Sequence, residues 1–188
     1  MRFYKLFFIN VLLILGYNKG FSQETKIQNY ICLSAQQAKN QMYSEGYELK
    51  IPDSWCAYIG FHDILMISPK STLNLKDNYV NNNLYVASYD NKTYKSKDIE
   101  EALKKHYVLL NDNSKFAPVY DESVHEDYGK YYIIKRSSIQ NGEKIMNLDL
   151  LFNHNNQDYI IYYSVLEKDF NANLNEVIQI MESFKIVE

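Results

Sequence analysis

The densest group of side chains that could do chemistry lies between Asp121 and Asp127. This stretch contains four carboxylates and one imidazole, from Asp121, Glu122, His125, Glu126 and Asp127. Carboxylates bind hard cations, and an added imidazole extends the choice to transition metals. The stretch lacks the Asp-x-Asp-x-Asp-Gly start of an EF-hand loop. Two hypotheses remain, a metal site and a solvated acidic hairpin loop, and the sequence favours the loop.

Enzymatic use of this acidic stretch would require further groups from elsewhere in the chain. A metal-dependent hydrolase would combine it with His62 or His154. No serine stands in a Gly-x-Ser-x-Gly turn, and no glycine-rich phosphate loop occurs. We therefore expect a protein that is not an enzyme and that carries no cofactor.

Cys32 and Cys56 are the only cysteines of the chain. In an exported protein an even pair favours a disulfide, which would stabilise the fold by about 3 kcal/mol in the chain-entropy model. The alternative is two unpaired thiols that are buried as small apolar side chains. The sequence leaves both open, because it does not give the distance between the two Cα atoms.

The first 22 residues are typical of a secretory signal peptide. Arg2 and Lys5 give a positively charged start, and residues 6–15 are apolar except for one asparagine. This run is about half of the roughly 20 residues that a helix needs to cross a bilayer. The small residues Gly20 and Ser22 predict cleavage after Ser22. We expect an exported protein, periplasmic or secreted, with no transmembrane anchor after cleavage.

The charge balance argues against a nucleic-acid partner. The chain has 20 basic and 23 acidic residues, a net charge of −3. Loss of the signal peptide would remove three basic residues and leave a net charge of −6, with Arg136 as the only arginine. Binding to a phosphate backbone needs clustered lysine and arginine.

The remaining chain has the length of one domain. We predict a polar segment at 23–44 with a helix at 34–43, followed by a single domain at 45–188. Alternating or continuous apolar runs predict strands at 47–51, 61–67, 84–89, 116–124, 130–139, 143–152 and 158–166. Helical spacing predicts helices at 97–110, with Ser96 as N-cap, and at 173–184.

The order of these elements predicts an α+β fold. Asn141-Gly142 is the strongest tight-turn signal in the chain. Strands joined by such turns are antiparallel, so residues 116–166 should form an antiparallel meander with helices packed on the faces of the sheet. The nearly continuous apolar run at 158–166 predicts a central strand that is covered on both faces.

Tyrosine is unusually common, with 18 in the chain. Tyr131, Tyr159 and Tyr163 lie in predicted neighbouring strands and are candidates for an exposed binding face, since tyrosine offers contact area at a low entropic cost. The alternative is that these rings reflect strand propensity and form part of the core, and the sequence favours this second interpretation.

Two stretches resemble the PsbP-like family. Residues 46–55, GYELKIPDSW, are similar to its opening strand and corner, and residues 178–185, IQIMESFK, are similar to its terminal helix. The resemblance covers about residues 45–188 and implies a central antiparallel sheet with helices on both sides. It also implies binding rather than catalysis, although no binding residue of a family member can be matched here.

The sequence as a whole favours an exported, non-enzymatic binding domain of PsbP-like α+β fold. Its partner would be a protein or another envelope component. Two alternatives stay open: a small-ligand carrier with a pocket between sheet and helices, and a metal-dependent hydrolase that uses the 121–127 stretch.

Overall fold

The computed structural model describes residues 31–60, 63–73, 82–88, 95–111, 119–140 and 142–187. The predicted signal peptide, residues 23–30 of the following polar segment, His62 and Asn141 lie outside these ranges. The elements are α2 (Ala35–Ser44), β1 (Tyr47–Glu48), β2 (Trp55–Ile59), β3 (Leu65–Pro69), β4 (Asn83–Ser88), α3 (Ile99–Asn111), β5 (Val119–His125), β6 (Gly129–Gln140), β7 (Glu143–His154), β8 (Gln157–Leu166), η3 (Glu167–Asp169), α4 (Leu174–Glu182) and β9 (Lys185–Ile186). None of the described helices is long and apolar enough to cross a membrane.

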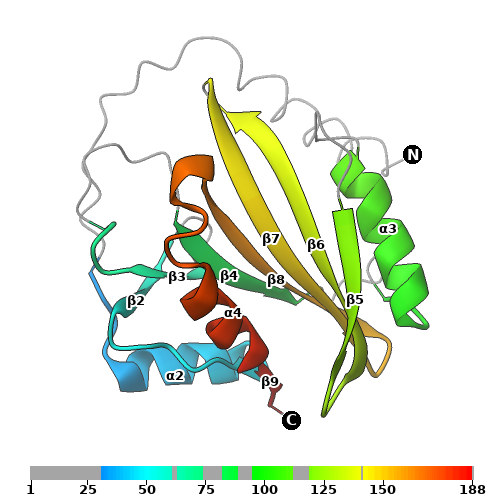
Figure 1. Cartoon of the computed structure of the whole chain (residues 1–188). Helices are drawn as coiled ribbons and strands as arrows, with labels where there is room; N and C mark the ends of the chain where they lie inside the picture. The colour runs from blue at the N-terminus through cyan, green and yellow to red at the C-terminus, as the bar shows by residue number, and fades with distance from the viewer. Residues whose placement is uncertain are drawn as a thin grey trace, which may run out of the picture.

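Seven strands form one antiparallel sheet in the order β2-β3-β4-β8-β7-β6-β5 (Figure 1). Strands β5 to β8 form the predicted meander, and β8 lies in the middle of the sheet between β4 and β7. β1 and β9 pair separately as a small antiparallel sheet. The predicted α+β class and the central position of residues 158–166 are confirmed.

Helix α2 begins and ends where its flanking residues dictate. The Ser34 hydroxyl accepts a hydrogen bond from the Gln37 backbone N–H, and the Gln37 side chain accepts one from the Ser34 N–H, which is a capping box. After the helix, Gly46 has a φ of 81°, in the left-handed region that glycine adopts without a Cβ clash. This turn directs the chain into β1.

The N-cap of α3 differs from the prediction. The Asp98 carboxylate accepts a hydrogen bond from the Glu101 N–H at 2.8 Å, so Asp98 provides the cap. The Ser96 hydroxyl instead donates to the fully buried Asp158 carboxylate at 2.7 Å. A buried carboxylate needs hydrogen-bond donors, and this demand takes Ser96 away from the helix.

Strand β2 was not predicted from the sequence. Four consecutive side chains from Trp55 to Tyr58 are buried, so the strand has no alternation of apolar and polar residues. Upstream, the predicted strand at 47–51 is reduced to the two residues of β1.

The larger core fills the space between one face of the sheet and the layer made by α2, α4 and the β1–β9 pair (Figure 1). Phe184, directly after α4, is fully buried at its centre. Its ring lies 6.2 Å from the ring of Tyr47, 5.4 Å from that of Phe152 and 5.7 Å from that of Tyr159, measured between centroids. The core therefore brings the start and the end of the domain together.

Polar contacts join the same two ends of the domain. The Trp55 indole N–H donates to the Glu176 carboxylate of α4 at 2.9 Å. The Lys50 N–H donates to the Ser183 hydroxyl at 2.8 Å. The two stretches that resemble the PsbP-like family are thus in direct contact in the folded chain.

A smaller core lies on the other face of the sheet, beneath α3. Ile99 and Ala102 of α3 pack against side chains of three strands. These are Tyr132, Ile134, Leu151 and Ile160. Both faces of the sheet therefore carry a helix, as the resemblance implied.

One ion pair is buried on the α3 face. The Arg136 Nε donates to the Asp149 carboxylate at 2.7 Å, and only 1% of the Asp149 surface is exposed. Burial raises the pKa of the Asp149 carboxyl from 3.8 to about 6, and the Arg136 charge offsets only part of this rise.

We expect this raised pKa to appear in the pH dependence of stability. The folded chain holds the Asp149 proton more tightly than the unfolded chain, so the stability this proton contributes is present below about pH 4 and is lost as the pH rises through about 6. The shift corresponds to about 3 kcal/mol. Urea unfolding from about pH 4 to 7.5 should show the parent chain losing stability relative to an Asp149→Asn variant. A difference between them that does not change with pH would contradict this.

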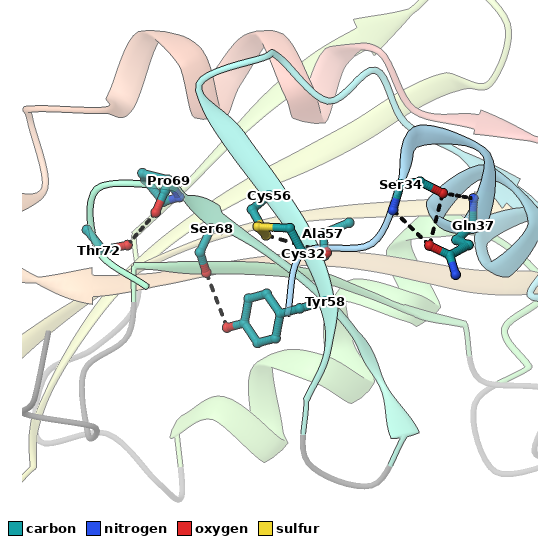
Figure 2. The surroundings of a disulfide bond; sticks show 9 residues. All are labelled: Cys32, Ser34, Gln37, Cys56, Ala57, Tyr58, Ser68, Pro69 and Thr72. Atoms are coloured by element: carbon teal, nitrogen blue, oxygen red, sulfur yellow. Dashed lines mark hydrogen bonds between the residues drawn. A yellow bond between two sulfur atoms is a disulfide. The ribbon is translucent and has the colours of Figure 1, made fainter. Parts of the chain in front are cut away.

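Cys32 and Cys56 are joined by a disulfide, with their Cα atoms 5.4 Å apart (Figure 2). The bridge ties the segment before α2 to strand β2. Next to it, the Leu33 N–H donates to the Ala57 carbonyl at 2.8 Å, so residues 32–33 run along the outer edge of β2. Figure 2 also shows the Ser68 hydroxyl of β3 directed at that of Tyr58 in β2.

Reduction of this disulfide should lower the free energy of unfolding by about 3 kcal/mol, because the bridge spans 24 residues and restricts the unfolded chain. Urea unfolding with and without dithiothreitol measures the effect. A Cys32→Ala/Cys56→Ala variant is the control, and its unfolding midpoint should not respond to dithiothreitol. The same midpoint for the parent chain in both conditions would disprove the prediction.

Candidate functional site

Strand β5 forms one edge of the large sheet (Figure 1). It pairs with β6 on its inner side, and no described strand pairs with its outer side. The outward N–H and C=O groups of an edge strand can hydrogen-bond to another extended chain. This edge is therefore able to accept a partner.

The opposite edge of the sheet is covered. Strand β2 receives a backbone hydrogen bond from Leu33, and the Cys32–Cys56 disulfide fixes that segment in place. Proteins commonly cover an edge in this way to prevent unwanted pairing. The two edges of the sheet therefore differ, and β5 is the one without such a cover among the described residues.

Large apolar side chains of β5 are exposed. Val119 is 64% exposed, Tyr120 49% and Val124 75%. Tyr120 makes an edge-to-face contact with Tyr132 of β6, with ring centroids 5.7 Å apart. The two valines offer apolar surface to whatever contacts this edge.

The acidic stretch 121–127 lies on β5 and the turn that follows it, and the strand divides its side chains between two faces. Asp121 and His125 are on the α4 face and Glu122 is on the α3 face. The Glu122 carboxylate forms an ion pair with the Lys130 ammonium at 2.7 Å. The same ammonium also contacts the Glu100 carboxylate of α3 at 2.9 Å. Both hydrogen bonds raise the pKa of Lys130, and the bond with Glu122 has the larger effect. The hydrogen bond with Lys130 in turn lowers the pKa of Glu100.

His125 is directed toward aromatic rings rather than toward the carboxylates. Its imidazole stacks on the Tyr128 ring at 4.7 Å and meets the Phe152 ring edge-on at 5.8 Å. His125 Nδ1 accepts a hydrogen bond from the Asp127 N–H at 3.1 Å. His154, the other candidate partner, also contacts Tyr128.

The described residues contain no group of three or more His, Cys, Asp or Glu side chains that could hold a metal ion. The side chains of the 121–127 stretch are instead divided between the two faces of β5 and the turn that follows it. Asp121, Glu126 and Asp127 are exposed at the edge and the turn, where they give this end of the sheet a negative charge.

The proposed tyrosine face needs correction. Tyr131, Tyr159 and Tyr163 are 7%, 8% and 0% exposed and belong to the core beneath α4. Strand alternation puts all three on the face that α4 covers, so they stabilise the fold and do not form an exposed surface.

The comparisons with known proteins bear on the fold. No protein-family model and no curated protein matches the sequence. The solution structure of the cyanobacterial PsbP from Synechocystis sp. PCC 6803 is similar over 89% of this chain and 98% of that one, with a TM-score of 0.51 and 12% sequence identity. The chain has a PsbP-like fold.

Two further solved structures share this PsbP-like architecture. One is LpqN of Mycobacterium tuberculosis, with a TM-score of 0.50 and 11% identity over 76% of this chain and 83% of that one. The other is a protein of Bacteroides thetaiotaomicron VPI-5482, with a TM-score of 0.50 and 9% identity over 76% of this chain. This chain spans 46% of the Bacteroides protein's length. At these identities the likeness concerns the fold alone.

A hollow lies among the described residues of the PsbP-like domain. It has a volume of about 310 Å³ and is lined by Leu33, Gln37, Asn40, Gln41 and Ile59. It lies beside α2 and the covered edge, not between the sheet and α3 or α4. It is at the lower limit of the usual size for ligand pockets, and three of its five lining residues are amides.

Sequence reasoning missed the role of β5 as an open edge. The available signal was the composition of Val119–His125, where charged and β-branched residues occur on both faces, as is usual for an edge strand. The strand order that places it at the edge depends on pairings between distant residues, and these could not be read from the sequence.

Proposed function

We propose that this chain is an exported, non-enzymatic binding domain that contacts a protein of the cell envelope through strand β5. The observation that carries the proposal is that no described residue pairs with the outer side of β5, while the other edge of the sheet is covered. An extended segment of a partner would add to β5 as a further strand, with main-chain hydrogen bonds for affinity and side chains for specificity.

The charge of β5 favours a basic partner segment. Of the four carboxylates in the 121–127 stretch, only Glu122 has an ion pair with another described residue. Lysine or arginine side chains on the partner would face Asp121 on the α4 face, while small apolar residues would cover Val124 on the α3 face. Opposite charges across paired strands are stabilising.

A second copy of this chain is a poor occupant of the same edge. Symmetric antiparallel pairing of β5 with itself about its middle residue would place Glu122 directly opposite Glu122. Like charges directly opposite each other destabilise a sheet. The acidic residues therefore reduce self-association and leave the edge accessible to a different chain.

The export part of the proposal is supported by the sequence of residues 1–22 and by the disulfide, which persists in oxidising compartments. LpqN, which shares the fold, is described as involved in cell envelope biogenesis. A binding role rather than catalysis is supported by the division of the 121–127 side chains between two faces of the sheet.

A blocked peptide of about nine alternating lysine and valine residues tests the edge. We expect it to shift the backbone amide resonances of residues 119–125 in ¹⁵N NMR, with an affinity that falls as salt is added. An Asp121→Lys variant should bind about fivefold more weakly. Glu143→Lys is the matched control, since it makes the same charge change at another exposed strand position, and its affinity should equal that of the parent chain.

Three results would overturn the proposed edge. The first is the absence of shifts in residues 119–125. The second is an equal loss of affinity in both variants, which would indicate unspecific attraction to an acidic protein. The third is equally tight binding of a peptide with glutamate in place of lysine.

Export is tested separately by the N-terminus of the protein produced in a bacterial host. We expect mass spectrometry of the periplasmic or secreted protein to give a chain that begins at Gln23, because the small residues before it fit a signal peptidase site. Recovery of a chain that retains Met1, or of all the protein in the cytoplasm, would contradict export without affecting the peptide test.

A further inference from the structure

A row of polar side chains crosses the α3 face of the sheet. The pairing register places Arg136 opposite Asn147, Asn147 opposite Ser164, and Ser164 opposite Asn83. Successive residues of a strand point to opposite faces, so these four share the face that carries Leu151 and Ile160 beneath α3. We call Arg136, Asn147, Ser164 and Asn83 the polar row.

The two ends of the polar row are satisfied by hydrogen bonds. At one end Arg136 donates to the buried Asp149 carboxylate. At the other end the Asn83 Oδ1 accepts hydrogen bonds from the hydroxyls of Tyr58 and Ser68. Neither end needs a ligand in order to complete its hydrogen bonding.

The centre of the polar row is not satisfied. Asn147 is 6% exposed, and its buried Nδ2 has no hydrogen-bond partner in the structure. The Ser164 hydroxyl, on the neighbouring strand, makes no hydrogen bond with a described residue. A buried amide without a partner lowers the stability of the folded chain. Such a cost is common where a side chain is kept for binding.

Two tyrosines lie beside this centre. Tyr162 precedes Ser164 by two residues on the same face, and its ring stacks on that of Tyr85 with centroids 4.9 Å apart. Both rings are half-buried. An amide, a hydroxyl and an aromatic surface are therefore adjacent on β7, β8 and β4.

The charges at this place cancel. Arg136 and Asp149 form an ion pair, and the other members of the polar row are neutral. An anionic ligand would add a second negative charge beside Asp149, and the Arg136 guanidinium would be the one positive charge of the polar row available to both. The balance favours a neutral ligand rich in hydroxyl groups, which can accept from the Asn147 amide and from the Ser164 hydroxyl while its carbon skeleton contacts an aromatic ring.

We infer that the centre of the polar row, at Asn147 and Ser164 beside Tyr162, is a binding site for a neutral saccharide. The site is separate from β5 and does not depend on the peptide-binding proposal. Asn147 would donate to a ring or hydroxyl oxygen, Ser164 would bind a neighbouring hydroxyl, and Tyr162 would contact the C–H groups of the sugar.

Matched sugar pairs test the ligand class. D-Glucose and D-glucuronate, and D-galactose and D-galacturonate, differ only in the carboxylate at C6. In ¹⁵N NMR of the purified chain at pH 7.5, we expect at least one neutral sugar to shift the Asn147 side-chain amide and the Ser164 backbone amide, with a Kd in the millimolar range. The matching acid should bind about tenfold more weakly or not at all.

A pair of asparagine substitutions tests the role of Asn147. Asn147→Leu keeps the approximate shape and removes an amide without a partner, so we expect an unchanged or higher Tm together with loss of sugar binding. Asn153→Leu is the control on the same strand and face. The Asn153 amide donates to the Ser96 carbonyl at 3.0 Å and to the Asp158 carboxylate at 2.7 Å, so its loss should lower Tm by several degrees.

The inference fails under any of four results. One is the absence of a saturable shift at Asn147 with about 100 mM of each neutral sugar in the folded chain. Another is equal or tighter binding of the acids, which would indicate a carboxylate ligand. A third is an Asn147→Leu variant that loses as much Tm as Asn153→Leu, since the amide would then have a structural role. The last is unchanged sugar affinity in Asn147→Leu.

Discussion

The burial of Phe184 is the contact on which most of the fold depends. Its ring touches β1 through Tyr47, the meander through Phe152 and Tyr159, and the turn after β5 through Tyr128. These segments come from both ends of the domain, so α4 holds its place only when all of them are formed. The hydrogen bond from the Trp55 indole to the Glu176 carboxylate adds a polar link between β2 and α4. Removing a ring from such a centre costs about 3–5 kcal/mol in well-packed cores, which is a large part of the stability of a small domain.

The two faces of the sheet meet different demands. The α4 face is apolar from Trp55 to Phe152, and its aromatic rings pack as a continuous layer. The α3 face is apolar only beneath the helix, and beyond it polar side chains follow the register from β6 to β4. A sheet selected for stability alone would carry apolar residues on both of these faces. The second face therefore departs from the requirements of packing at Asn147 and Asp149, and departures of this kind are expected where a protein binds something.

Much of the fold could be predicted from local pattern. The continuous apolar run of β8 and the amphipathic spacing of α4 each specify one element, and both elements lie where they were expected. The predictions that were wrong concern residues whose local structure is determined by a contact with a distant part of the chain. Ser96 bonds to Asp158 and leaves the helix cap to Asp98. The chain at Trp55–Tyr58 lacks alternation because both its faces are covered. Tyr131, Tyr159 and Tyr163 stayed candidates for an exposed face beside the favoured core interpretation, because nothing local reveals the helix that covers them. The open edge at β5 and the polar row are likewise products of strand order and register.

The contrast between the two sheet edges also has a physical origin. The edge at β2 is protected covalently, because one disulfide holds residues 32–33 along the strand. At β5 the protection is of another kind, because its negative charges oppose pairing with an identical strand but attract a basic one. Apolar side chains as exposed as Val119 and Val124 would favour aggregation on a neutral edge. Beside Asp121 and Glu122 they instead favour a partner that matches both the apolar surface and the charge, so the same residues that limit self-association define what can bind.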